Sequence, residues 1–474
     1  MMRPVSPGPS FLEVNSANLP AIFSRGVPVP TYNRSLLVPR ILHIGVGGFH
    51  RSHLALYTHE AASRGETWGI RGLGLLAQDT QIASNLGEQD YLYSLTEKGP
   101  DHFDTIVIGS IIDFRLAASD ESAAHSAIAD PNVKILSLTI TAAGYVEPQS
   151  GQRTTFDVIA SGLEARRRNH SGPVTVLSCD NLPGNGDAAK AALISAGKRH
   201  SNELAEWIDI SCSFPNSMVD RITPQTTQQD RQWLADSFQI NDLCPVVGEP
   251  FRQWVIEDKF VAGRPRWEDV GVLFTDNVHA WELYKLRMLN ASHSCMAYLS
   301  ALAGITYVDE AMNVSAIVAY LEELLHNEAI PTLVEIPGHS RKEYARVTLE
   351  RFRNTGVRDQ IARLCIDGTA KFPTFLIPTV QRQLELDGPI RCSALALAAW
   401  AVYLGTVPVD QQSFDTSGDA TRALAAKATK DPLAFLDLET VFPEALRNCD
   451  RFRQQFVNAY RTIAESGPLA AIVG

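Results

Sequence analysis

The sequence predicts an α/β protein of two domains, a parallel β-sheet with covering helices followed by a mostly α-helical half. Three observations support this fold class: the length, the alternation of apolar runs with helical segments up to about residue 278, and the end of that alternation afterwards. The chain has 474 residues, more than one hydrophobic core usually organises. We therefore predict domains at 1–278, including an N-terminal arm at 1–40, and at 279–474.

The first half contains runs rich in β-branched and apolar residues, separated by segments with helical spacing. Strands are expected at 41–48, 68–77, 91–97, 104–114, 133–141 and 173–181, and helical segments at 50–63 and 157–170. The apolar runs lack a period-2 alternation, which fits strands buried on both faces. Strands that alternate with helices imply β-α-β units and a parallel sheet.

The second half has helical spacing almost throughout. A long helical segment is expected from 279 to 304, followed by helical segments at 312–328, 341–366, 375–386, 393–405, 417–428 and 452–466. Prolines are expected to interrupt these segments at Pro331, Pro337, Pro373, Pro378 and Pro408. No internal repeat is visible in the sequence.

The composition is that of a globular chain, with 45% hydrophobic and 20% charged residues. A net charge of −11 without a basic run argues against nucleic acid and anionic membranes as partners. The longest apolar stretches, such as 394–404, are too short to cross a bilayer, and residues 1–10 lack the apolar region of a secretory signal. Seven scattered cysteines without a C-x-x-C pair indicate reduced thiols, and hence a cytoplasmic protein.

A glycine-rich loop follows the first predicted strand. Gly45, Gly47, Gly48 and Phe49 lie where this strand leads into a helix, a place where glycines let the backbone approach a pyrophosphate. The full G-x-G-x-x-G fingerprint is not met, and a turn that simply requires glycine is the alternative. After the second strand comes Asp79, placed to accept hydrogen bonds from an adenosine ribose and to repel the extra phosphate of NADP. A plain helix N-cap is the alternative role for Asp79.

Three polar side chains recur in the long helix that begins the second half. At about 100° per residue, Asn290 and His293 lie ~60° apart and Lys285 and His293 ~80° apart, so all three share one broad face. A desolvated lysine can act as a base near neutral pH, and an asparagine amide can donate to an oxygen that gains negative charge. An amphipathic helix with a buried histidine is the alternative.

A further asparagine, Asn181, ends the strand predicted at 173–181. Ligands of parallel sheets bind outside the carboxyl ends of the strands, so two amides from different domains can act on one oxygen. Capping of the helix that starts near Asp187 is the alternative role for Asn181.

Taken together, these motifs resemble the mannitol dehydrogenase family of polyol-specific long-chain dehydrogenases and reductases, and within it most of all the mannitol 2-dehydrogenases. The similarity covers roughly residues 40 to 465. It rests on segments in a shared order at 43–57, 136–145, 177–186, 213–224, 246–260, 285–293 and 367–375.

The resemblance implies a Rossmann-type domain that binds NAD, a helical domain that closes over the substrate, and oxidation of D-mannitol to D-fructose. It assigns Lys285 as general base, Asn181 and Asn290 as oxyanion donors, and His293 as the residue that orients the substrate. It places Asp220, Arg363 and Lys371 around the substrate and makes Asp79 the residue that favours NAD; Gln78 departs from a second acidic residue often found there. The family works without metal, and the His50–His53 pair has no further histidine or cysteine nearby to complete a site.

Other functions remain open from the sequence. A hexuronate reductase, such as fructuronate or tagaturonate reductase, needs a cation for the substrate carboxylate, and Arg363 or Lys371 can serve there. Arabinitol dehydrogenase is a further alternative, and an NAD-binding sensor with idle catalytic residues is an alternative of another class, although a sensor has no need of a base. We expect a monomer or a small homo-oligomer.

Overall fold

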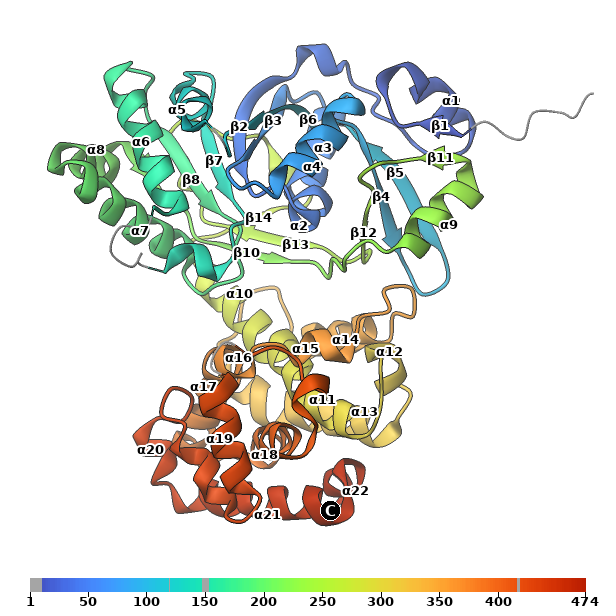
Figure 1. Cartoon of the computed structure of the whole chain (residues 1–474), viewed down its shortest axis with the longest axis vertical. Helices are drawn as coiled ribbons and strands as arrows, with labels where there is room; N and C mark the ends of the chain where they lie inside the picture. Colours follow the sequence, from blue (N-terminus) through green and yellow to red (C-terminus); the bar gives the residue numbers. More distant parts are fainter. Residues whose placement is uncertain (1–10, 119, 147–152, 416–417) are drawn as a thin grey trace, which may run out of the picture. The chain divides into compact units, whose positions relative to one another are not determined.

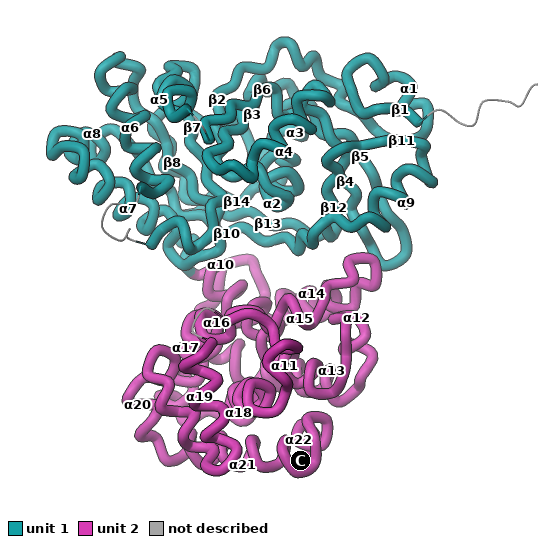
Figure 2. The backbone as a smooth tube through the Cα atoms, viewed as in Figure 1, with its two compact units in different colours: residues 1–279 teal, residues 280–474 magenta. Residues whose placement is uncertain are grey.

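The computed structural model describes residues 11–118, 120–146, 153–415 and 418–474. It separates into two units, residues 1–279 and 280–474 (Figure 2). The predicted boundary, after residue 278, lies in the same helix, α10 (Val278–Tyr284). Among the described residues, no helix is long and apolar enough to span a membrane. The prediction about a secretory signal concerned residues 1–10, which lie outside the described residues.

The centre of unit 1 is a six-stranded sheet in which every pair of neighbouring strands is parallel (Figure 1). Its strands, in spatial order, are β6 (Ile111–Leu116), β3 (Trp68–Gly74), β2 (Val38–Ile44), β7 (Ile135–Leu138), β8 (Val174–Ser178) and β9 (Cys212–Ser213). The chain starts at β2, builds outward through β3 and β6, and then continues on the other side of β2. This reversal between β2 and β7 is the switch point of a Rossmann fold.

Helices cover both faces of this sheet. They are α2 (Gly48–Ser52), α3 (Leu54–Ser63), α4 (Asp79–Glu88), α5 (Glu121–Ala129), α6 (Thr155–Arg168), α7 (Asn185–His200) and α8 (Asn202–Ser211). Side chains of β2 alternate between two cores: Ile41 packs with Trp68 and Trp254, whereas Leu42 packs with Phe156 on the other face. Burial on both faces explains why the strand runs lack polar alternation.

Further strands form three small sheets at the periphery of unit 1. They are β4 (Tyr93–Lys98), β5 (Phe103–Ile108) and β12 (Val246–Gly248); β10 (Ser217–Asp220), β13 (Gln253–Ile256) and β14 (Leu273–Phe274); and β1 (Leu12–Glu13) with β11 (Ile240–Asn241). The prediction of one strand run at 104–114 was wrong. Gly109 and Ser110 divide it into β5 and β6, which belong to different sheets.

The described part of the N-terminal arm packs on unit 1. It contains α1 (Leu19–Ser24) and the short 3₁₀ helices η1 (Ser16–Asn18) and η2 (Arg34–Leu36). Val14, Ile22 and Val27 form one apolar cluster with Leu92 and Ile240, the last of these next to α9 (Gln228–Phe238). The remaining 3₁₀ helices of the unit are η3 (Ala142–Tyr145) and η4 (Trp267–Val270).

Unit 2 is mostly helical, as predicted, so that the expected fold class is confirmed. After α10 its helices are η5 (Lys285–Asn290), α11 (Ala291–Leu302), α12 (Val308–Ala311), α13 (Ser315–Glu323), η6 (Leu324–Ala329), η7 (Ile330–Thr332), α14 (Arg341–Phe352), α15 (Ile361–Leu364), α16 (Gly368–Phe375), α17 (Ile377–Glu385), α18 (Arg391–Thr406), η8 (Val409–Gln411), α19 (Gly418–Ala428), η9 (Pro432–Asp437), α20 (Glu444–Arg447), α21 (Asp450–Ser466) and α22 (Pro468–Val473). η5 and η6 are π-helical.

The buried helix α18 begins without a capping side chain of its own. The Glu328 carboxylate, which is fully buried, takes that role from η6: it accepts the backbone N–H groups of Cys392 and Ser393 at 2.6 and 2.9 Å. An ionised group beside a helix N-terminus satisfies orphan donors and interacts favourably with the helix dipole.

Two details of the predicted helices were wrong. The segment 341–366 is not continuous, because residues 353–360 leave the helical conformation between α14 and α15. Pro373 does not interrupt a helix but lies inside α16, which ends two residues later. The interruption comes before Pro378, which occupies the first turn of α17, where its missing N–H costs no hydrogen bond. Residue 417, the predicted start of α19, lies outside the described residues.

Candidate functional site

The four predicted cofactor-binding residues of the glycine loop lie between the end of β2 and the start of α2. Gly45 has φ +92°, and a Cβ atom there would come within 2.2 Å of the Thr139 carbonyl oxygen at the end of β7. Glycine is therefore required at this position. Gly47 precedes α2 as its N-cap residue, and a Cβ atom at Gly48 would meet Thr223 and Val246 only at ordinary contact distance. The Phe49 ring stacks on His53 with 4.9 Å between ring centroids.

Asp79 is the first residue of α4, just beyond β3. Its Oδ2 accepts the Leu76 N–H at 2.9 Å, which shapes the turn between strand and helix. The N-cap residue is Gln78, so Asp79 is not a plain N-cap. In the described part of the chain, Oδ1 of Asp79 has no hydrogen-bond partner, which leaves a half-buried acceptor at the carboxyl end of β3.

A polar network joins the carboxyl ends of β7 and β8. The buried Asp180 carboxylate accepts the Thr141 N–H at 2.7 Å and the Tyr145 hydroxyl at 2.7 Å. Burial raises the pKa of Asp180, and these hydrogen bonds oppose the rise. Sequence reasoning missed Tyr145 and Asp180, although both belong to the motifs quoted above. Thr141 has φ +64°, a strained backbone conformation of the kind that often marks functional sites.

Asn181 follows this network as an exposed residue at the end of β8. The N-cap of α7 is Gly184, so neither Asp180 nor Asn181 caps that helix. The neighbouring amide, Asn185, is the structural one: it donates to the Asp180 and Ser217 carbonyl oxygens at 3.1 and 2.7 Å. Asn181 is thus held in place by the strand end, while its side chain lies at the surface of unit 1.

Asp220 ends β10 and is almost fully buried in unit 1. Close by, the His53 Nε2 atom lies 3.0 Å from the Gln253 carbonyl oxygen. Burial lowers the pKa of His53 to about 3, and the negative charge of Asp220 is among the effects that oppose this. His53 is therefore neutral, and its contacts with Phe49 and Tyr57 are those of a packed aromatic ring.

In unit 2, Lys285, Asn290 and His293 lie on one continuous helix formed by α10, η5 and α11. Lys285 and His293 are buried, 8% and 9% exposed, and the His293 ring stacks on Phe352 at 4.1 Å. The Asn290 Nδ2 atom is buried and has no hydrogen-bond partner among the described residues. A donor in this situation is available to an oxygen of a ligand.

The π-helical conformation of η5 changes the predicted geometry. The helical-wheel angles assumed α spacing, in which Lys285 and Asn290 lie about 140° apart. A π-helix closes its turn between residues i and i+5, which brings Lys285 and Asn290 toward a common face. Lys285 and Asn290 therefore occupy a narrower arc of the helix surface than the helical-wheel angles predicted. π segments occur frequently at functional sites.

Arg363 and Lys371 belong to neighbouring short helices of unit 2. The Arg363 guanidinium forms a two-point ion pair with Asp359, in which Nε lies 2.6 Å from Oδ1. Lys371 Nζ donates to the Leu364 carbonyl oxygen at 2.9 Å. Burial, together with the positive charge of Arg363, lowers the pKa of Lys371 to about 8. The two cations thus differ: Asp359 neutralises Arg363, whereas Lys371 carries an ammonium that its surroundings disfavour.

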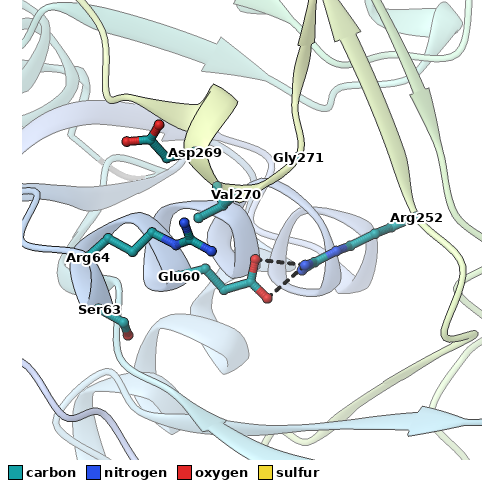
Figure 3. A pocket seen from close by; sticks show the side chains of 7 residues that line it. All are labelled: Glu60, Ser63, Arg64, Arg252, Asp269, Val270 and Gly271. Carbon is teal, nitrogen blue, oxygen red and sulfur yellow. Dashed lines mark hydrogen bonds and ion pairs between the residues drawn. The ribbon is translucent and has the colours of Figure 1, made fainter.

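Two further observations concern residues outside the predicted site. No group of three or more His, Cys, Asp or Glu side chains suited to a metal ion exists within the described ranges. A hollow of about 520 Å³ lies beside the C-terminal end of α3, where Arg252 Nη2 donates to both Glu60 carboxylate oxygens at 2.7 Å (Figure 3). It is lined by Glu60, Ser63, Arg64, Arg252, Asp269, Val270 and Gly271.

Comparison with known proteins identifies relatives along nearly the whole chain. A mannitol dehydrogenase of Saccharomyces cerevisiae is 37% identical, covering 95% of both chains, and a mannitol 2-dehydrogenase of Aspergillus fumigatus is 38% identical, covering 96% of this chain and 97% of its own. The solved structure of Pseudomonas fluorescens mannitol 2-dehydrogenase with NAD and D-mannitol matches with a TM-score of 0.88 and 37% identity, over 98% of this chain and 99% of that one. A D-sorbitol dehydrogenase in substrate-free form matches with a TM-score of 0.87 and 32% identity, over 97% and 100%.

Family models agree with these relatives. The mannitol dehydrogenase Rossmann domain matches residues 39–269, and the mannitol dehydrogenase C-terminal domain matches residues 277–464. The matched ranges cover most of the chain and follow the order of the two units. The chain therefore belongs to the mannitol dehydrogenase family.

Proposed function

We propose that this protein oxidises D-mannitol to D-fructose with NAD, and catalyses the reverse reduction, by hydride transfer at C2. As a member of its family the protein is an NAD-dependent polyol dehydrogenase. The relative of known structure from P. fluorescens carries NAD and D-mannitol, which supports this substrate. The observation that carries the proposal is the buried face of the α10–η5–α11 helix, with Lys285, His293 and the available donor of Asn290.

The residues of unit 1 suit a dinucleotide. Gly45 brings the loop after β2 against the end of β7, at the switch point of the sheet, where such folds bind dinucleotides. Asp79 keeps one carboxylate oxygen available beyond β3, where an adenosine ribose is held in comparable folds. NAD, when bound, supplies the acceptor for the hydride that leaves C2.

The proposed chemistry of the chain's own residues concerns one proton and one oxygen. Lys285, neutral when the alcohol binds, takes the proton of the C2 hydroxyl. Asn290 and Asn181 donate to the oxygen as it gains negative charge, an effect of about 3 kcal/mol per donor in comparable sites. His293, fixed by its stacking on Phe352, orients the hydroxyl.

Asp220, Arg363 and Lys371 are proposed to contact the hydroxyl groups of the polyol. Asp359 neutralises Arg363, and burial disfavours the ammonium of Lys371, so neither of these two cations is well suited to a substrate carboxylate, which favours a neutral polyol over a hexuronate. A cytoplasmic location and a monomeric or small oligomeric state remain predictions. The reduced thiols support the location, since all seven cysteines are free and six of them are buried.

The test is NADH consumption with D-fructose, D-fructuronate, D-tagaturonate and D-xylulose, followed by NAD reduction with D-mannitol and D-sorbitol. These two alcohols differ only in the configuration at C2, so the preferred one reveals which face of the ketone receives the hydride. We expect D-fructose and D-mannitol to give the highest kcat/KM. A far higher kcat/KM for D-fructuronate would replace the proposal with a hexuronate reductase, and a preference for D-sorbitol would correct the polyol.

A further inference from the structure

The carbonyl oxygen of Gly45 is held by three donors. The Gly47 N–H lies 2.7 Å away, the Thr139 hydroxyl 2.6 Å and the His43 Nε2 atom 3.2 Å. His43 is fully buried on β2. Its Nε2 also lies 3.0 Å from the Thr139 hydroxyl oxygen, and its Nδ1 lies 2.8 Å from the Ser137 hydroxyl oxygen on β7. His43 thus ties the glycine loop to the neighbouring strand across the switch point.

The network fixes the form of the His43 ring. The Thr139 hydroxyl donates its one proton to the Gly45 carbonyl oxygen, so both neighbours of Nε2 are acceptors; Nε2 therefore carries the ring proton, and Nδ1 accepts from Ser137. Burial lowers the pKa of His43 to about 3, which keeps the ring neutral. The His50 ring, on the far side of the loop, stacks on His43 with 3.4 Å between centroids and a 13° interplanar angle. The two stacked imidazoles, one from β2 and one from α2, are both buried.

The direction of the Gly45 carbonyl determines the direction of the next N–H. A trans peptide is planar, so the Val46 N–H points opposite to the Gly45 C=O. The carbonyl is turned toward His43 and Thr139, in the protein interior, and the N–H is turned away from them. Within the described ranges the Val46 N–H has no hydrogen-bond acceptor, while the Val46 side chain is packed in the core of unit 1.

We infer that His43 is a positioning residue for the dinucleotide: by holding the Gly45 carbonyl inward, it aims the Val46 N–H at the diphosphate of NAD. Thr139 shares this role through its hydroxyl. The inference rests on the proposed binding of NAD by unit 1, and it gives a reason for a buried histidine, His43, that the proposed chemistry does not use. His43 itself touches neither the cofactor nor the substrate.

The experiment compares His43→Leu, His43→Gln and Thr139→Val with the wild type. Glutamine places an amide N–H near the position of Nε2, so His43→Gln should restore what His43→Leu loses. Inhibition constants are measured against NADH for ADP-ribose, which contains the diphosphate, and for adenosine, which does not. His59→Leu is the matched control. His59 is also a buried histidine of unit 1, but its Nδ1 is hydrogen-bonded to the Tyr32 hydroxyl and accepts the Gly109 N–H, and both of these partners lie outside the glycine loop 45–48.

We expect His43→Leu to weaken NADH and ADP-ribose binding by about tenfold or more, Thr139→Val to weaken both by a smaller factor, and adenosine binding to stay unchanged. At saturating NADH, kcat should stay within about twofold of the wild type. Equal binding of ADP-ribose by His43→Leu and wild type would overturn the inference, as would an equal loss for adenosine. If His43→Leu does not fold, Thr139→Val decides: equal ADP-ribose binding by Thr139→Val and wild type, or an equal loss for adenosine, would then overturn the inference. Wild type that fails to bind NADH would instead overturn the proposed function.

Discussion

Replacement of Lys371 by methionine should stabilise the protein at neutral pH. The pKa of Lys371 falls from its ordinary value of 10.5 to about 8, chiefly because of burial. This difference corresponds to about 3 kcal/mol against the ammonium in the folded state at pH 7. The variant also loses the hydrogen bond to Leu364, worth about 1 kcal/mol. The net expectation is a gain of about 2 kcal/mol in the free energy of unfolding.

The difference in the free energy of unfolding between Lys371→Met and wild type should change sign with pH. Between pH 8 and 10.5 the unfolded chain holds a proton that folded Lys371 has lost, so the contribution of Lys371 to the free energy of unfolding rises over this range. At pH 11 both states are largely neutral, the gain of Lys371→Met disappears, and only the lost hydrogen bond remains, which makes the variant less stable by about 1 kcal/mol.

Guanidinium chloride unfolding at pH 7 and at pH 11 measures this crossover, with Lys342→Met as the control on an exposed lysine of the same unit. A Lys371→Met variant that is less stable than wild type by the same amount at both pH values would refute the reasoning. A lysine kept at a cost in stability indicates a functional role. The variant should accordingly raise KM for D-mannitol and leave the Kd of NADH unchanged.

Three further predictions concern chemistry, coenzyme and fold. Lys285→Ala should lower kcat for mannitol oxidation by orders of magnitude and abolish the rise of kcat with pH that the base causes, whereas Asn290→Ala should lower kcat by about a hundredfold at every pH. Steady-state rates from pH 6 to 10 distinguish the two variants, and a wild-type kcat in Lys285→Ala would show that another group is the base. Asp79→Ala should raise the kcat/KM ratio of NADPH to NADH because it removes a like charge from the ribose phosphate, and an unchanged ratio would mean that Asp79 does not contact the ribose. Glu328→Ala should lower the free energy of unfolding by about 3 kcal/mol, since two buried N–H groups lose their acceptor, whereas the exposed control Glu350→Ala should lower it by less than about 1 kcal/mol. Equal melting temperatures for the two variants would contradict the capping of α18 by Glu328.

The sequence predicted the parts of the fold that depend on burial pattern and glycine. Strands buried on both faces have continuous apolar runs, which can be recognised in the amino-acid sequence. Gly45 can be recognised too, because a close contact at this position requires glycine. The peripheral strands β1, β10, β11, β12, β13 and β14 were not predicted, because two to four residues carry too little pattern. The division of 104–114 left a signal in Gly109, which the apolar residues on either side obscured.

The residues of the candidate site were named by type and motif, while their surroundings required the structure. Tyr145 and Asp180 act on each other across 35 positions, and their pairing depends on two strands lying side by side. The π segment 285–290 has the amino-acid composition of an ordinary α-helix. Its π conformation therefore depends on packing in unit 2 and could not be predicted from residue propensities.

The π segment also has a consequence for helical phase. One π turn equals one α turn plus a single residue, so removal of one residue between Lys285 and Asn290 converts the segment into an uninterrupted α-helix. In the shortened helix the lysine and the asparagine become neighbours at i and i+4, still on one face. A one-residue deletion, unlike any substitution, therefore removes the π turn and keeps the pair on one face, with the residues before and after it in one unbroken α-helical phase.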